Sequence, residues 1–165
     1  MSWNGTMRVL DASSILYAWD NYPFAQFPGL WGWLADEIQT HELAISVVAL
    51  DEVGHKAPEC SDWLKAAGVL RLPMSAEVVM VAMSIKQAIG VANDQYHPKG
   101  VDENDLLIIA AAKVHGAKLI TNEARQFGLQ VEARKYKIPA VCDMPSVGVV
   151  SMNFLEYIQK SKQVF

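Results

Sequence analysis

The sequence predicts an α/β protein, a three-layer α/β/α sandwich with a mainly parallel central sheet. Short apolar segments of strand length alternate with longer segments of helical periodicity, and helices of ten or more residues between strands are typical of crossovers that join parallel strands. In addition, 52% of the 165 residues are hydrophobic and 19% are charged, which supplies enough apolar side chain for one core. We expect a single domain, residues 1–165.

The individual elements follow from these patterns in chain order. The expected strands are residues 7–10, 43–46, 69–72 and 118–121. The expected helices are residues 13–19, 30–39, 47–56, 61–67, 75–92, 102–115 and 152–160. Ser61 and Asp102 are expected to cap their helices, Gly116 to end the helix that Asp102 begins, and Ser151 to start the last helix.

Charge and cysteine content exclude several classes of protein. The chain has 14 Lys and Arg against 18 Asp and Glu, a net charge of −4, so it does not coat nucleic acid through bulk positive charge. Two cysteines cannot build a disulfide scaffold, so we expect the reducing cytoplasm. No apolar run reaches the roughly 18 residues of a membrane span, and the N-terminus lacks the charged and apolar regions of a signal peptide.

Four acidic residues lie where this fold class carries its sites. Ligands of open parallel sheets bind beyond the carboxyl ends of the strands. Asp11 follows the first strand, Glu52 lies in the helix after the second, Asp105 opens the helix that begins at residue 102, and Glu123 follows the fourth strand. Carboxylates gathered at one sheet edge, with no obvious Lys or Arg beside them, need cations, and oxygen ligands suit Mg²⁺ or Mn²⁺. Two such ions can activate water and stabilise the leaving oxygen of a phosphodiester.

Each acid also has a purely structural interpretation. Asp11 could cap the following helix, Glu52 could be an ordinary exposed helix acid, and Asp105 could support its helix end beside Asp102. Asp105 is the most informative, because the residues three, four and seven positions further on are apolar. A carboxylate therefore begins the stripe that enters the core, where it needs a partner. Glu123 alone indicates little.

The motifs around these acids resemble those of PIN domains, the fold of the VapC toxin ribonucleases. The four motifs are residues 9–13 (VLDAS), 50–53 (LDEV), 104–112 (NDLLIIAAA) and 119–123 (LITNE). Their order and distances match over about residues 7–157, and the third motif is the most specific. The aromatic segment 22–33 and the tail 136–142 resemble a little-characterised PIN branch close to VapC.

The resemblance implies an endoribonuclease that depends on Mg²⁺ or Mn²⁺ and hydrolyses RNA phosphodiester bonds with a metal-activated water. The implied catalytic residues and metal ligands are Asp11, Glu52, Asp105 and Glu123. As in VapC, the chain would be the toxin of a toxin–antitoxin pair, with an antitoxin protein as partner. PIN relatives are often dimers, so a homodimer is a further expectation.

Supporting residues and rival assignments complete the expected site. Ser13 and Thr121 match small hydroxyl positions of PIN sites. The fourth acid is Glu123, where many relatives have Asp. Asp51 beside Glu52 offers a rival ligand, and so does Asp102, which we interpret as the helix cap.

The densest basic cluster is Arg134, Lys135 and Lys137. It is either a solvated loop or the contact surface for RNA phosphates. Two other functions stay open. One is a structure-specific DNA nuclease, although that class carries more acids and DNA-binding appendages than 165 residues accommodate. The other is a non-catalytic PIN-like scaffold that binds RNA or protein. Metal-dependent cleavage of RNA and DNA substrates distinguishes the three.

Overall fold

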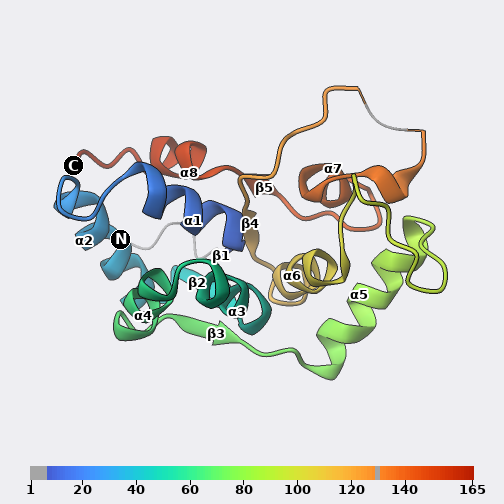
Figure 1. The fold of residues 1–165 in the computed structure, drawn as a ribbon, viewed down its shortest axis with the longest axis horizontal. Helices are drawn as coiled ribbons and strands as arrows, with labels where there is room; N and C mark the ends of the chain where they lie inside the picture. The colour runs from blue at the N-terminus through green and yellow to red at the C-terminus, as the bar shows by residue number, and fades with distance from the viewer. Residues whose placement is uncertain (1–6, 129–130) are drawn as a thin grey trace.

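The computed structural model describes residues 7–128 and 131–165. Five strands form one sheet, in the order β3-β2-β1-β4-β5, and every neighbouring pair is parallel (Figure 1). The strands are β1 (Arg8–Leu10), β2 (Leu43–Ser46), β3 (Leu70–Leu72), β4 (Lys118–Ile120) and β5 (Ser151–Met152). Because all strands run the same way, their carboxyl ends meet at one edge of the sheet.

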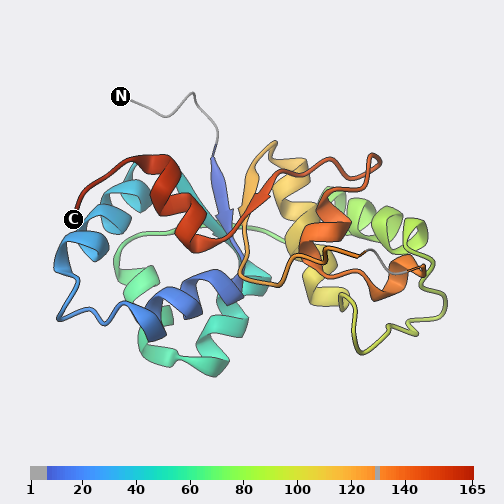
Figure 2. The same ribbon diagram turned by 90° about the horizontal axis from the view of Figure 1, so that it is seen from above.

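Helices cover both faces of this sheet. They are α1 (Ala12–Asn21), α2 (Pro28–Gln39), α3 (Val47–Lys56), α4 (Pro58–Ala66), α5 (Ala76–Ala88), α6 (Glu103–Val114), α7 (Ile138–Cys142) and α8 (Phe154–Ser161), with a 3-10 turn at Ala133–Lys135. Figures 1 and 2 show α1, α2, α4 and α8 on one side and α5, α6 and α7 on the other. Right-handed crossovers require this split, since the chain steps one way from β1 to β3 and back again to β4. The predicted three-layer α/β/α fold is confirmed.

The helix α6 lies at the centre of one layer. Leu106 and the whole run from Ile108 to Ala112 are buried, and the helix packs against β4, α5 and α7. A helix that is apolar on all sides is buried on all sides. Because α6 returns through a short turn to β4, its N-terminus lies at the edge where the strands end. Residues 102–105 are thereby brought to the expected site region.

Two predicted helix starts are wrong. The helix α4 begins at Pro58, so Ser61 lies inside it and caps nothing; proline favours the first helical turn because its fixed φ suits that position. Ser151 belongs to the strand β5. Asn153 caps α8 instead, because its side chain accepts a hydrogen bond from the Glu156 N–H in a capping box.

One helix end and one short helix also differ from expectation. The helix α5 ends at Ala88 rather than near residue 92, because Gly90 adopts a φ of 80° that ends the helix in the left-handed region. The five-residue helix α7 was not predicted. Across residues 7–128 and 131–165, none of the helices combines the length and apolar character needed to cross a membrane.

Candidate active site at the carboxyl edge of the sheet

Asp11 is held by hydroxyl groups from two distant parts of the chain. It follows β1 directly and is only 3% exposed. Its Oδ2 accepts hydrogen bonds from Ser13 Oγ at 2.5 Å and from Thr121 Oγ1 at 3.0 Å. Although Asp11 stands at the N-cap position of α1, its side chain makes no capping hydrogen bond. The capping interpretation of this acid is therefore not what the geometry favours.

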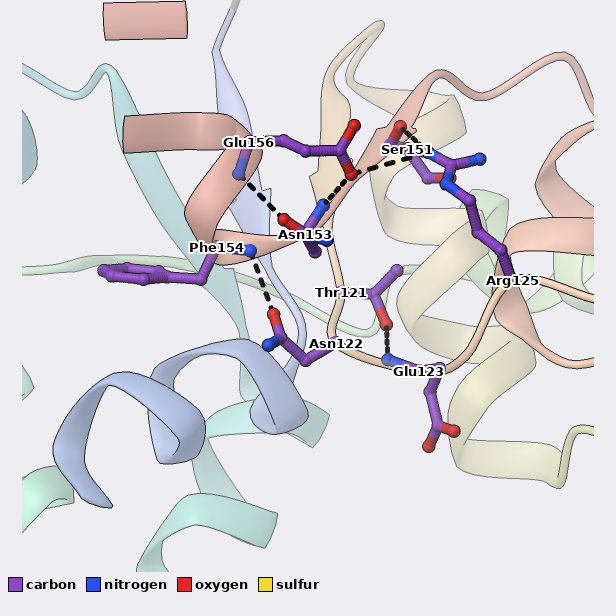
Figure 3. A network of polar contacts seen from close by, with 8 residues as sticks. All are labelled: Thr121, Asn122, Glu123, Arg125, Ser151, Asn153, Phe154 and Glu156. Carbon is purple, nitrogen blue, oxygen red and sulfur yellow. Dashed lines mark hydrogen bonds and ion pairs between the residues drawn. The ribbon is translucent and has the colours of Figure 1, made fainter. Parts of the chain in front are cut away.

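The same hydroxyls fix the loop after β4. The Asn122 N–H donates to Ser13 Oγ at 2.9 Å, and the Glu123 N–H donates to Thr121 Oγ1 at 3.2 Å. Asn122 Oδ1 in turn accepts the Phe154 N–H at 2.9 Å (Figure 3). The backbone of Glu123 is thus positioned by the residues that hold Asp11.

The N-terminus of α6 carries a reciprocal capping box. Asp102 Oδ1 accepts the Asp105 N–H at 2.8 Å, and Asp105 Oδ2 accepts the Asp102 N–H at 3.0 Å. Asp102 is therefore the helix cap, as interpreted from the sequence. Asp105 also supports the helix end, but the same side chain lines a cavity. The structural and functional interpretations of Asp105 apply together.

The helix α3 separates the two neighbouring acids Asp51 and Glu52. Asp51 is exposed, and its Oδ2 lies 3.5 Å from His55 Nε2 one turn later. Glu52 lines the cavity, where the neighbouring Asn104 side chain favours its charged form. Of these two rivals, only Glu52 lies with the other acids.

One polar cavity of about 430 Å³ collects most of the candidate acids. Its carboxylate lining consists of Glu52, Asp102, Asp105 and Glu123. Asp11 is not among the residues that line this cavity, but its charge acts on both Glu52 and Asp105. Four chain segments far apart in sequence therefore deliver acids to one place.

Three of these acids have raised pKa values. Burial raises the pKa of Asp105 to about 8, and the charges of Asp102, Asp11 and Glu123 add to the effect. Burial also raises the pKa of Glu52, again helped by the charges of Asp11 and Asp102. For Asp11, burial raises the pKa against the opposing hydrogen bonds from Ser13 and Thr121. Burial is thus the largest cause of each rise.

The donor chemistry fits a hard divalent cation, whereas the spacing of the side chains does not yet form a coordination sphere. Every candidate ligand is a carboxylate oxygen, the donor that Mg²⁺ and Mn²⁺ prefer. Within the described residues, however, no three His, Cys, Asp or Glu side chains are grouped closely enough to hold a metal ion. Any such ion would have to draw the carboxylates together.

Comparison with known proteins adds a family and a fold. Residues 9–165 match the family described as a domain of unknown function (DUF4411). The chain belongs to this family. That description assigns no activity. No curated protein matches the sequence.

Among solved structures, this DUF4411 chain is similar to a chain of VapBC2 from Rickettsia felis, solved bound to a DNA fragment from their promoter. The TM-score is 0.57 at 19% sequence identity, and the match covers 90% of this chain and 98% of the other. A likeness at this identity shows the fold alone. It supports the PIN-like fold that the four motifs predicted.

Two members of the basic cluster have neighbours that the sequence did not indicate. Arg134 Nε pairs with Glu132 Oε2 at 2.7 Å. Lys137 lines the acidic cavity together with Lys56, so two lysines do lie beside the acids, contrary to the sequence-based expectation. None of the ion pairs found in the described residues joins a lysine to Glu52, Asp105 or another cavity carboxylate.

A glycine seats the loop that carries Lys137 against the cavity. A Cβ on Gly100 would lie 1.9 Å from the Arg134 carbonyl oxygen and 3.0 Å from the Lys135 Cα. Only glycine permits this approach of two backbones. Gly100 itself lines the cavity, so the contact forms part of its wall.

Sequence reasoning missed several residues at this edge. Lys56 lies one helical turn after Glu52, and that spacing of four was a readable signal. Asn122 lies within the motif of residues 119–123, but that motif gave it no expected role. Arg125 lies two residues beyond Glu123 in a second cavity that depends on β5, a strand that the sequence analysis did not predict.

Proposed function

We propose that this protein is a metal-dependent endoribonuclease that hydrolyses RNA phosphodiester bonds, and that it is the toxin of a toxin–antitoxin pair. One observation carries the proposal: carboxylates from four separate segments line or adjoin one cavity, and the pKa values of Asp11, Glu52 and Asp105 are raised. Mutually repelling acids destabilise the folded chain, and a bound cation relieves that cost.

In this proposal Asp11, Glu52, Asp105 and Glu123 hold Mg²⁺ or Mn²⁺. When bound, such ions supply an activated water and neutralise charge on the leaving oxygen. The hydroxyls of Ser13 and Thr121 orient Asp11 through its Oδ2.

The two lysines act on the substrate rather than on the acids. Lys56 and Lys137 line the same cavity, where their charges attract a phosphodiester toward an otherwise acidic surface. Four lining carboxylates outnumber these two cations, so the substrate phosphate is repelled unless a further cation is present. The proposed activity is therefore strictly metal-dependent. RNA contacts by Arg134 and Lys135 outside the cavity remain part of the proposal.

The experiment compares two neighbouring acids on α3. Wild-type protein, Glu52→Gln and Asp51→Asn are incubated with structured RNAs and DNAs in Mg²⁺, Mn²⁺ or EDTA. We expect RNA cleavage in either metal, none in EDTA, and loss of cleavage in Glu52→Gln but not in Asp51→Asn. No cleavage by wild type under any condition, or equal cleavage by both variants, contradicts the proposal. Preferential cleavage of branched DNA supports the DNA nuclease instead.

The wide spacing of the acids favours one alternative function. Because no three of the searched side chains in the described residues are close enough to hold a metal, a non-catalytic scaffold that binds RNA or protein is the alternative. It predicts RNA or protein binding without cleavage in every metal tested.

The toxin role has its own test. The motifs of this chain resemble those of VapC toxins, and the likeness of its fold to a chain of VapBC2 supports an antitoxin partner here. We expect expression of the wild type in the cytoplasm of a host cell to arrest the growth of that cell, and expression of Glu52→Gln to leave growth unaffected. A homodimer is checked by light scattering of the purified chain.

A further inference from the structure

A second cavity adjoins the acidic one. It has a volume of about 390 Å³ and is lined by the loop after β4, the end of β5 and the start of α8. Glu123 lines both cavities. Figure 3 shows the Glu123 carboxylate pointing away from Arg125, so this residue divides two spaces of different character.

The second cavity presents a pre-positioned cation. Arg125 Nη2 donates to the Ser151 carbonyl oxygen at 3.0 Å and lies 3.9 Å from Glu156 Oε1 (Figure 3). Glu156 is itself fixed, because Oε1 accepts the Asn153 N–H at 3.0 Å. Both contacts of Arg125 run through Nη2, so Nε and Nη1 are not used by them. A guanidinium held in this way suits the oxygens of a phosphate.

Two amide side chains in this cavity have their oxygens committed. Asn122 Oδ1 accepts the Phe154 N–H, and Asn153 Oδ1 accepts the Glu156 N–H at 2.7 Å. Their remaining Nδ2 groups are hydrogen-bond donors. The lining of the second cavity therefore includes hydrogen-bond donors, whereas carboxylate acceptors outnumber the lysines in the lining of the acidic cavity.

Two further side chains in this cavity are available to a ligand. Ser151 is 7% exposed, and its Oγ has no hydrogen-bond partner within the part of the chain that the structure describes. A buried hydroxyl without a partner is costly unless water or a ligand satisfies it. Phe127 lines the same cavity and is fully exposed. An exposed aromatic ring beside a cation and donors is the arrangement on which single-stranded bases stack.

We propose that this second cavity binds the nucleotide next to the scissile phosphate, with its phosphate on Arg125 and its base on Phe127. The inference rests on the proposed ribonuclease function, since it assigns the acidic cavity to the cleaved bond. It adds that a single-stranded segment, rather than a base-paired one, is recognised. Sharing Glu123 places the two subsites side by side along one strand.

The test measures binding in Mg²⁺ to an oligonucleotide with hydrolysis-resistant phosphorothioate linkages, so that the acidic cavity does not repel the RNA and cleavage does not interfere. Fluorescence anisotropy with a labelled five-nucleotide ribo-oligonucleotide compares wild type with Phe127→Ala and Arg125→Gln. The matched controls are Met80→Ala, an exposed apolar residue on α5, and Arg71→Gln, an exposed arginine on β3. Competition with uridine 5′-monophosphate and with inorganic phosphate separates a nucleotide site from an anion site.

We expect Phe127→Ala to weaken oligonucleotide binding roughly 5- to 150-fold, the range for losing one base stack. Arg125→Gln should weaken both oligonucleotide and phosphate binding, and the controls should bind as wild type. The inference is overturned if Phe127→Ala binds normally, or if phosphate competes as well as the nucleotide. The inference is also overturned if Phe127→Ala and Arg125→Gln weaken the binding of a protein partner but leave oligonucleotide binding unchanged. If the variants show the expected binding pattern but the wild type cleaves no RNA, the ribonuclease proposal is contradicted and the nucleotide site is supported.

Discussion

A carboxylic acid is buried at each end of the sheet, and the two acids have different charged neighbours. At the carboxyl end, burial raises the pKa values of Glu52 and Asp105, and the charges of Asp11 and Asp102 add to both rises. On the other side of the core, Glu37 of α2 is 8% exposed. Burial raises the pKa of Glu37, the negative charge of Glu42 adds to that rise, and the positive charge of Arg8 opposes it.

The difference lies in where the compensating charge comes from. Glu37 has a buried arginine of the same chain near it, and Arg8 also lies 5.8 Å from the Tyr157 ring. At the carboxyl end the charge of Lys56 opposes the rise at Glu52, but no cation in the part of the chain that the structure describes opposes it at Asp105. Lys56 and Lys137 form none of the ion pairs found in the described residues. Folding alone requires no such accumulation of negative charge, so the contrast supports a cation from outside the chain.

The largest effect is expected for Asp105→Asn. The amide oxygen can still accept the Asp102 N–H, so the capping box survives while one negative charge is removed. We expect cleavage to fall by about two orders of magnitude or more, the scale of losing a group that organises transition-state charge. The metal-free variant should be as stable as wild type or more stable. Glu103→Gln, in the same helical turn, is the control, and an active but destabilised Asp105→Asn would break the comparison.

The next effect is a dependence of stability on pH that metal reverses. The pKa of Asp105 is about 8 in the folded chain against 3.8 ordinarily, so the folded state binds more protons between these values. The free energy of unfolding of the metal-free protein should therefore fall as pH rises from about 4 to 8. At pH 8, Mg²⁺ at 100 times its dissociation constant should restore about 2.7 kcal/mol. Urea denaturation at several pH values measures both, and a rising profile contradicts the assignment.

A smaller loss is expected when the hydroxyl of Thr121 is removed. Thr121→Val keeps the shape of the side chain but leaves Asp11 Oδ2 without one donor and the Glu123 N–H without its acceptor. We expect a loss of roughly 1–3 kcal/mol of stability, the cost of unsatisfied buried polar groups. Thr121→Ser keeps the hydroxyl and should recover most of it. Equal stability of the two variants would show that the hydroxyl does not hold the site.

The smallest effect is expected at the opposite end of the sheet. Glu37→Gln mimics the protonated acid that burial favours, so at pH 8 stability should change by no more than about 1 kcal/mol, toward greater stability. Its response to Mg²⁺ and its cleavage rate should match wild type. A reduced Mg²⁺ response in this variant would show that the two regions are coupled.

Long elements with clear caps were predictable from the sequence. The ranges expected for β2 and α3 match the structure to the residue, because an apolar run ends at Ser46, whose side chain then caps the helix by accepting the Ala49 N–H. The strand β5 was missed because two residues cannot show periodicity, and α7 because five residues barely complete one turn. At Ser61, the stronger start signal of Pro58 was overlooked.

The candidate site was predictable only as a set of motifs. The sequence could not choose between Asp51 and Glu52, because that choice depends on the rotational phase of α3 against the sheet. It placed Lys137 in a basic cluster that contacts RNA, but it could not indicate that Lys137 lines the acidic cavity. The catalytic roles of the acids stay predictions. The second cavity was beyond reach, since its wall includes the unpredicted strand β5.

The hydroxyl pair around Asp11 has a consequence for the order of events during synthesis. Asp11 is translated early, but its partner Thr121 is made 110 residues later, and the Thr121 N–H is itself bonded to the Met152 carbonyl oxygen at 2.8 Å. A nascent chain emerges from the ribosome N-terminus first. The acidic cavity therefore cannot be completed until both β4 and β5 have been synthesised and have left the ribosome.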